Sequence, residues 1–208
     1  MSNNENVIRV THIQKQFGRH VVLRDVSFEA ARSEIIGIVG ENGSGKTTLL
    51  KILVGLLNPN SGEIQIKAPI AYCPQDPVVF DLLTIRENLL YFGTGYGLEK
   101  REIHKKSKNL MEIFNCTKYT DYLVSQVSEG TRQKVNLMIS LLPPSDLLLL
   151  DEPYQGFDYS TYIDFWNYST ELRKEGKTIL VVSHMIVKDS YFDRIISLNG
   201  GYSHVIKD

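Results

Sequence analysis

Residues Gly40-Glu41-Asn42-Gly43-Ser44-Gly45-Lys46-Thr47 match G-x-x-x-x-G-K-T, the pattern of a Walker A phosphate loop. A short apolar run of strand length, Ile35–Val39, precedes it, and Thr48–Leu53 after it has the pattern of a helix. Strand, glycine loop and helix form the context that this motif requires. The alternative is a glycine turn that precedes a helix by chance. The strand before the motif and the helix after it make this alternative unfavourable.

The residue types in this stretch suit an anion. Glycines let the backbone curl so that successive N–H groups point inward, and a helix starting near Lys46 adds its positive end. The Lys46 ammonium can reach the β- and γ-phosphates of a nucleotide, and the Thr47 hydroxyl can bind Mg²⁺. The loop therefore predicts a nucleotide phosphate site.

Composition places the chain among ordinary globular proteins. It has 208 residues, 42% hydrophobic and 23% charged, with a formal net charge of −1. This balance gives no electrostatic footprint for nucleic acid, so we expect no nucleic-acid partner. The densest basic cluster, Lys105–Lys108, is typical of the solvated face of a helix.

Cysteine usage and hydropathy indicate a reduced, cytosolic chain that does not cross a membrane. Cys73 and Cys116 form no C-x-x-C motif, and Met1–Asn6 is too polar for a signal peptide. The most apolar region, Val135–Leu150, falls short of the roughly 20 apolar residues that span a bilayer, and Pro143-Pro144 interrupts it.

The first third of the chain predicts a small antiparallel sheet beside the phosphate loop. Its expected strands are Val7–Ile13, one or two within Val21–Ala30, and Ser61–Lys67. We expect Ala71–Pro77, which holds two prolines, to break the chain.

The middle of the chain predicts a helical insertion. Thr84 can cap a helix, with Glu87 completing a capping box, and Glu99–Phe114 has amphipathic spacing. Gly93, Gly95 and Gly97 are expected to break the chain between the two helices.

The last third predicts a doubly wound α/β core. A helix opens at Ser128 and ends at Pro143, and a second helix covers Tyr162–Glu175. The expected strands are Leu147–Leu150, followed by Asp151-Glu152, then Thr178–Ser183, which ends at His184, and Arg194–Leu198 and His204–Ile206.

These motifs, in this order, resemble the nucleotide-binding subunits of ABC transporters over nearly the whole chain. The matching residues are Phe17 (the adenine-stacking A-loop), Gly40–Thr48 (Walker A), Gln75 (the Q-loop), Ser128-Glu129-Gly130-Thr131 (the LSGGQ signature), Leu147–Asp151 (Walker B) followed by Glu152, Asp158 (the D-loop) and His184 (the switch histidine).

The resemblance implies a RecA-like P-loop α/β core with a flanking antiparallel β subdomain and an inserted α-helical subdomain. All of residues 1–208 would form a single ABC domain. Its ATP-binding core would comprise residues 1–76 and 127–208, and its helical subdomain residues 77–126.

The resemblance also implies the site residues. Glu152, His184 and Gln75 would act in catalysis, and Thr47, Gln75 and Asp151 would hold Mg²⁺. The ATP-binding residues would be Phe17, Gly40, Glu41, Asn42, Gly43, Ser44, Gly45, Lys46, Thr47, Thr48, Ser128, Gly130 and Asp158.

Several of these residues have plainer interpretations. Phe17 could pack on the small sheet, Gln75 could be a surface loop residue, and His184 could be a satisfied core histidine. Asp151 and Glu152 could be a simple strand end. The phosphate loop earlier in the chain favours the functional interpretation of each.

The signature departs most from the family, because Glu129 replaces its first glycine and Thr131 its glutamine. We expect Ser128 to cap the helix and Glu129 to lie in its first turn. One hypothesis is that the Glu129 carboxylate weakens ATP-driven dimerisation; the alternative is that it points to solvent.

The expected function is that of an ATP-binding and ATP-hydrolysing subunit, peripheral on the inner face of the cell membrane. It would power a separate permease, of the small bacterial exporter type, through a head-to-tail dimer that encloses two ATP molecules. The alternatives are a soluble ABC ATPase acting on ribosomes or nucleic acid, a small-molecule kinase, and a binding module without catalysis. The permease would choose the substrate.

Overall fold

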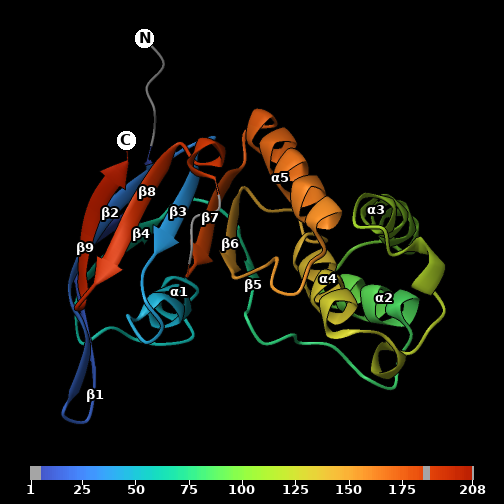
Figure 1. The fold of residues 1–208 in the computed structure, drawn as a ribbon, viewed down its shortest axis with the longest axis horizontal. Helices are drawn as coiled ribbons and strands as arrows, with labels where there is room; N and C mark the ends of the chain where they lie inside the picture. Colours follow the sequence, from blue (N-terminus) through green and yellow to red (C-terminus); the bar gives the residue numbers. More distant parts are fainter. Residues whose placement is uncertain (1–5, 185–187, 208) are drawn as a thin grey trace. The chain divides into compact units, whose positions relative to one another are not determined.

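The computed structural model describes residues 6–184 and 188–207. By its internal contacts the chain divides into two compact units. The first comprises residues up to Tyr72, Ser145–Glu152, and the chain from Thr170 onward; the second comprises Cys73–Pro144 and Pro153–Ser169 (Figure 1).

The first unit is built on one sheet. Within the described residues its strand order is β4-β1-β2-β9-β8-β3-β7-β6-β5. The strands are β1 (Asn6–Phe17), β2 (His20–Ala31), β3 (Ile35–Val39), β4 (Ser61–Ile66), β5 (Ile70–Cys73), β6 (Leu147–Asp151), β7 (Thr178–Ser183), β8 (Arg194–Asn199) and β9 (Tyr202–Lys207).

The centre of the sheet is parallel and wholly buried. Strand β3 pairs with β7 and β8, and β6 pairs with β7, all in parallel. Every residue of β3, β6 and β7 is buried, as the continuous apolar runs predict for strands covered on both faces. The carboxyl ends of β3, β6 and β7 carry the phosphate loop, Asp151 and His184, respectively.

The N-terminal strands form the predicted antiparallel part. Strand β1 pairs antiparallel with β2 and with β4. This part is continuous with the parallel strands, because β2 joins β9 through the pair Asp25 and Tyr202. The two kinds of strand therefore share one sheet.

Helix α1 (Lys46–Leu53) packs on this sheet. Its buried side chains Leu49, Leu50, Ile52 and Leu53 join the same hydrophobic cluster as strand residues such as Ile36 and Leu149. Burying each leucine contributes about 1.5–3 kcal/mol, so this packing holds α1 on the sheet.

One strand contradicts the expected break at Ala71–Pro77. Residues Ile70–Cys73 form β5, the edge strand beside β6. The backbone N–H groups of Asp146 and Leu147 both donate to the Pro69 carbonyl, at 3.2 Å each, which brings the two segments together. The break begins only at Pro74, which has no N–H to donate.

The second unit contains α2 (Ile85–Gly95), α3 (Lys100–Ile113), α4 (Glu129–Ser140) and the first part of α5 (Tyr159–Lys174). Short 3₁₀ helices are η1 (Thr117–Tyr119) and η2 (Val124–Gln126), and η3 (Asp189–Tyr191) lies in the first unit. The contacts group α4 and residues 153–169 with α2 and α3. The predicted boundaries at residues 77 and 126 stay a prediction.

The predicted capping box is confirmed. The Thr84 hydroxyl accepts from the Glu87 N–H at 3.1 Å, and the Glu87 carboxylate accepts from the Thr84 N–H at 2.8 Å. The expected break at Gly93 is wrong, because α2 continues through it to Gly95. A Cβ at Gly93 would crowd the Ile103 side chain, so this glycine permits close packing of α2 on α3.

No helix among residues 6–184 and 188–207 is long and apolar enough to span a bilayer.

Candidate active site

The phosphate loop has the backbone that its sequence predicts. Gly43 and Gly45 have φ of +81° and +101°, a region that side-chain-bearing residues rarely adopt. Helix α1 begins at Lys46 without a side-chain cap, so no side chain competes with an anion for its first N–H groups. A Cβ at Gly40 would overlap the Leu198 carbonyl oxygen of β8, so only glycine fits there.

Lys46 is buried and points back over the loop. Its ammonium donates to the carbonyl oxygens of Gly40 at 2.7 Å and Glu41 at 2.9 Å. Burial lowers the pKa of Lys46, while the charges of Glu152 and Asp151 act to raise it. Within the described part of the chain Lys46 makes no ion pair, so its charge is available to an incoming anion.

Asp151 ends β6 with its carboxylate fully buried. Burial raises its pKa, and the Thr47 hydroxyl opposes this shift. Neither carboxylate oxygen makes a hydrogen bond of ordinary geometry within the described residues. A buried carboxylate that the Thr47 hydroxyl satisfies only weakly is unfavourable, so the position suits a cation.

The cation that fits is a small oxygen-binding one. The described residues contain no group of three or more His, Cys, Asp or Glu side chains able to hold a metal by themselves. Asp151 with Thr47 would supply one or two oxygen ligands, which is how Mg²⁺ is commonly held beside phosphates.

Glu152 follows Asp151 in an unusual backbone conformation. Its φ is +48°, in the left-handed region that costs a residue with a Cβ about 1–3 kcal/mol. Its N–H donates to the Val182 carbonyl at 3.0 Å, which ties this turn to β7. The sequence motif did not predict this strain, which recurs at functional sites.

His184 lies beside Glu152. Its Nδ1 is 3.5 Å from Oε2 of Glu152, and its side chain is 53% exposed, whereas that of Glu152 is 12% exposed. The alternative interpretation of His184, as a buried core histidine whose hydrogen bonds are all made within the protein, is therefore wrong. The structure brings the phosphate loop, Asp151, Glu152 and His184 together in the first unit.

Phe17 ends β1 at the tip of the β1–β2 hairpin, where it pairs with His20. Its side chain is 47% exposed, so it does not pack into the sheet as the plainer interpretation required. Farther along the hairpin, a Cβ at Gly45 would meet Leu23 and Val22 of β2, so β2 packs directly on the phosphate loop.

Ser128 caps α4 in the second unit, as predicted. Its Oγ accepts from the Thr131 N–H at 3.3 Å and lies 3.0 Å from the Thr131 hydroxyl. Thr131, which replaces the family glutamine, thus fixes the side chain of Ser128 through both its N–H and its hydroxyl group. Glu129 is exposed in the first turn of α4, where its charge suits the helix dipole.

Gly130 and Gly156 bring the signature and the D-loop into backbone contact. A Cβ at Gly130 would overlap the Gly156 carbonyl oxygen, and Gly156 itself has a φ of +74°. Sequence reasoning did not predict this contact. This backbone contact explains why the chain has glycine at both positions, although they lie far apart in sequence.

Replacing Gly130 with alanine is expected to lower the free energy of unfolding by about 1–3 kcal/mol, because the new methyl group would force the two segments apart. The matched control is Gly95→Ala, also helical, where a Cβ would meet nothing within 4 Å. Urea denaturation of both variants tests this. An equal free energy of unfolding for Gly130→Ala and Gly95→Ala would show that the contact with Gly156 does not exclude a side chain at position 130.

Asp158 caps α5. Its carboxylate accepts from the Thr161 N–H at 3.0 Å and from the hydroxyls of Ser160 and Thr161, and these bonds hold its pKa well below the usual range. The nearly buried Lys134 of α4 donates to Asp158 at 3.3 Å and to the Thr161 hydroxyl at 2.8 Å. The predicted role of Asp158 at the nucleotide stays a prediction.

Gln75 also lies in the second unit, half-buried just after β5. Asn136 of α4 holds the chain on both sides of it, because its amide donates to the Pro74 carbonyl at 2.8 Å and accepts from the Val78 N–H at 3.1 Å. Sequence reasoning missed Asn136, since a single asparagine in a helix gives no local signal.

This chain is similar to known proteins of one family. The family model described as "ABC transporter" matches residues 23–155. The ABC transporter ATP-binding protein NatA of Bacillus subtilis is 35% identical over 193 residues, covering 86% of this chain and 78% of that protein. The Nod factor export ATP-binding protein I of Bradyrhizobium diazoefficiens is 30% identical over 214 residues, covering 97% and 70%.

A solved structure, titled as the ATP-binding subunit of an ABC transporter, superposes with a TM-score of 0.86 at 26% identity, covering 96% of this chain and 90% of that one. This protein belongs to the ABC transporter family. It is the ATP-binding, ATP-hydrolysing subunit of such a transporter, and nothing in the comparisons supports a role on nucleic acid or ribosomes.

Proposed function

We propose that this subunit powers export through a separate membrane permease, by closing as a head-to-tail dimer around two ATP molecules and then hydrolysing them. One observation carries the proposal. The chain holds one phosphate loop, in its first unit, and one signature segment, in its second. Two copies arranged head to tail supply both parts to each nucleotide.

On the first unit, Lys46 and the amides of Gly40–Thr48 bind the phosphates, and the exposed ring of Phe17 stacks on adenine. Mg²⁺ would be held there by Thr47 and Asp151 and would neutralise phosphate charge. The predicted role of Gln75 at the metal and in catalysis stays a prediction. Glu152 accepts the proton of the attacking water. His184, whose Nδ1 lies 3.5 Å from Oε2 of Glu152, orients the γ-phosphate.

On the second unit, Ser128 and Gly130 contact the γ-phosphate bound by the other copy. Asp158 and Lys134 hold the D-loop against α4, so that both segments move together. Glu129 is exposed, and its charge faces the opposite phosphate only in the dimer.

The permease docks on the segment that follows Gln75. Large apolar side chains are exposed there, and such a cluster on a subunit marks an interaction site. The ring centroids of Phe80 and Tyr91 lie 4.8 Å apart and those of Phe80 and Phe92 5.6 Å apart, so these aromatic side chains pack on one another. The exposed members are Val78, Phe80, Leu82, Leu90, Tyr91 and Tyr96.

Docking to a permease would hold the subunit on the inner face of the cell membrane. Export is favoured over import by a relative named for Nod factor export, which this chain matches over nearly its whole length. The chemistry of the transported substrate would be read by the permease.

A photo-crosslinker tests the docking surface. Benzoylphenylalanine at Leu82, which is 83% exposed, should form an adduct in native membranes with a protein that crosses the bilayer several times, identified by mass spectrometry. The same probe at Leu56, 65% exposed on the first unit, is the matched control and should form none. A ribosomal or nucleic-acid-binding adduct at position 82 would contradict the proposal.

A further inference from the structure

The segment that carries Gln75 has little structure of its own. Pro74 and Pro77, on either side of Gln75, have no N–H to donate. Among the described residues, no backbone group of residues 74–77 bonds to another backbone group. The Gln75 side chain is half-buried and makes no hydrogen bond with any described residue. Its amide is therefore available to a ligand, and its position depends on what holds the segment.

Asn136 of α4 holds this segment at both ends. Its side chain is only 2% exposed. The amide nitrogen donates to the Pro74 carbonyl at 2.8 Å and lies 3.4 Å from Sγ of Cys73, while the amide oxygen accepts from the Val78 N–H at 3.1 Å. A buried amide that lost these partners would be unfavourable. Asn136 and residues 74–78 therefore fix one another in a single arrangement.

The same helix carries the signature segment. Ser128 caps α4 about two helical turns before Asn136. Between them, the buried Lys134 donates to Asp158 at 3.3 Å. All of these residues lie in the second unit. Because a helix is stiff over this length, Asn136 ties the backbone around Gln75 to the helix end that presents Ser128.

We propose that Asn136 is a positioning residue for ATP hydrolysis. It fixes the backbone on both sides of Gln75 and so places the Gln75 amide at the bound nucleotide, which Asn136 itself does not touch. The proposal rests on the predicted role of Gln75 within the proposed function. Misplacing a reacting group by about 1 Å costs up to about a hundredfold in rate, so loss of the clamp should slow turnover.

A double-mutant cycle on the purified whole chain tests this proposal. ATP hydrolysis is measured for the wild type, Asn136→Ala, Gln75→Ala and the double variant, below the melting temperature of each. Asn136→Ala should lower kcat about tenfold or more, while the KM for ATP changes less than about twofold because the phosphate loop is untouched. Since Asn136 acts through Gln75, adding Asn136→Ala to Gln75→Ala should cost nothing further.

Asn136→Leu repeats the cycle with a side chain of nearly the same shape. Leucine fills the volume of the amide and suits a helix, so this variant keeps α4 packed where alanine leaves a cavity. It removes both the donor to Pro74 and the acceptor from Val78. It should lower kcat as Asn136→Ala does, and again only when Gln75 is present.

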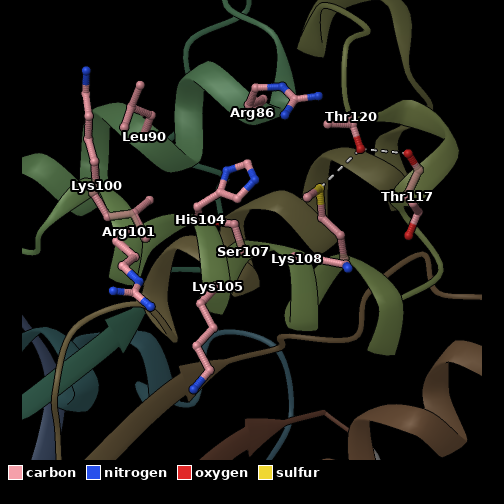
Figure 2. A pocket seen from close by; sticks show the side chains of 12 residues that line it. Arg86, Leu90, Lys100, Arg101, His104, Lys105, Ser107, Lys108, Thr117 and Thr120 are labelled. Carbon is pink, nitrogen blue, oxygen red and sulfur yellow. Dashed lines mark hydrogen bonds between the residues drawn. The ribbon is translucent and has the colours of Figure 1, made fainter.

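Thr120→Val is the control, because it removes a side-chain hydrogen bond in the same unit. The Thr120 hydroxyl lies 2.6 Å from the Thr117 carbonyl and 3.4 Å from Sδ of Met111 (Figure 2). These residues line a cavity of about 830 Å³, and neither Gln75 nor Asn136 is among its lining residues. Valine keeps the volume of threonine, so kcat should stay at the wild-type value.

Three results would overturn the proposal. The first is a wild-type kcat for Asn136→Ala and Asn136→Leu. The second is an equal loss of kcat with and without Gln75, which would make Asn136 a structural residue only. The third is a wild-type kcat for Gln75→Ala, which would remove Gln75 from the reaction. None of them bears on ATP hydrolysis by the subunit itself, which variants of Lys46 and Glu152 test separately.

Discussion

Lys46→Ala is expected to remove most of the ATP affinity and all measurable hydrolysis. The ammonium is buried at the phosphate loop, where the carbonyl oxygens of Gly40 and Glu41 hold it and its charge is available to a nucleotide. Charge-assisted hydrogen bonds contribute about 1.5–3 kcal/mol each, so affinity should fall by about tenfold to a hundredfold. Titration of a fluorescent ATP analogue measures this directly.

The matched control is Lys51→Ala, an exposed lysine in the last turn of the same helix. It removes an equal charge from α1 while the Lys46 ammonium stays in place, so ATP affinity should stay close to that of the wild type even though the Lys51 charge acts on Asp151. Unchanged affinity in Lys46→Ala would mean that the loop is not the nucleotide site.

Glu152→Gln is expected to keep ATP binding while turnover falls by about a hundredfold or more. The amide is nearly isosteric with the carboxylate but cannot accept a proton from water, and general bases contribute about 10²–10⁴ in rate. Release of inorganic phosphate at saturating ATP measures the loss.

The exposed Glu171 on α5 provides the control, since Glu171→Gln makes the same chemical change at a residue outside the site. It should hydrolyse ATP normally. A Glu152→Gln variant that turns over at the wild-type rate would exclude this residue as the base.

Local sequence patterns were enough to predict most of the fold. The apolar run Leu147–Leu150 and the strand before His184 are buried as predicted, since a strand covered on both faces leaves no room for polar residues. The Thr84 and Ser128 caps follow from short-range hydrogen bonds, which depend only on residues three apart.

Features that depend on partners distant in sequence were not predicted. Strand β5 forms because an edge position beside β6 was available to it, which no property of Ile70–Cys73 shows. The Gly130–Gly156 contact and the Asn136 clamp on residues 74–78 likewise join segments 26 or more residues apart. The left-handed backbone of Glu152 is imposed by its neighbours against its own preference.

In the proposed mechanism ATP joins two copies of this chain, and the solution mass of Glu152→Gln tests this most directly. In size-exclusion chromatography with light scattering, ATP and Mg²⁺ should shift the variant from 23.7 kDa to twice that mass, because ATP is bound and not consumed. Adding Lys46→Ala to the same chain should abolish the shift. A mass that stays at 23.7 kDa at saturating ATP, or a dimer that forms equally without ATP, would contradict ATP-driven dimerisation.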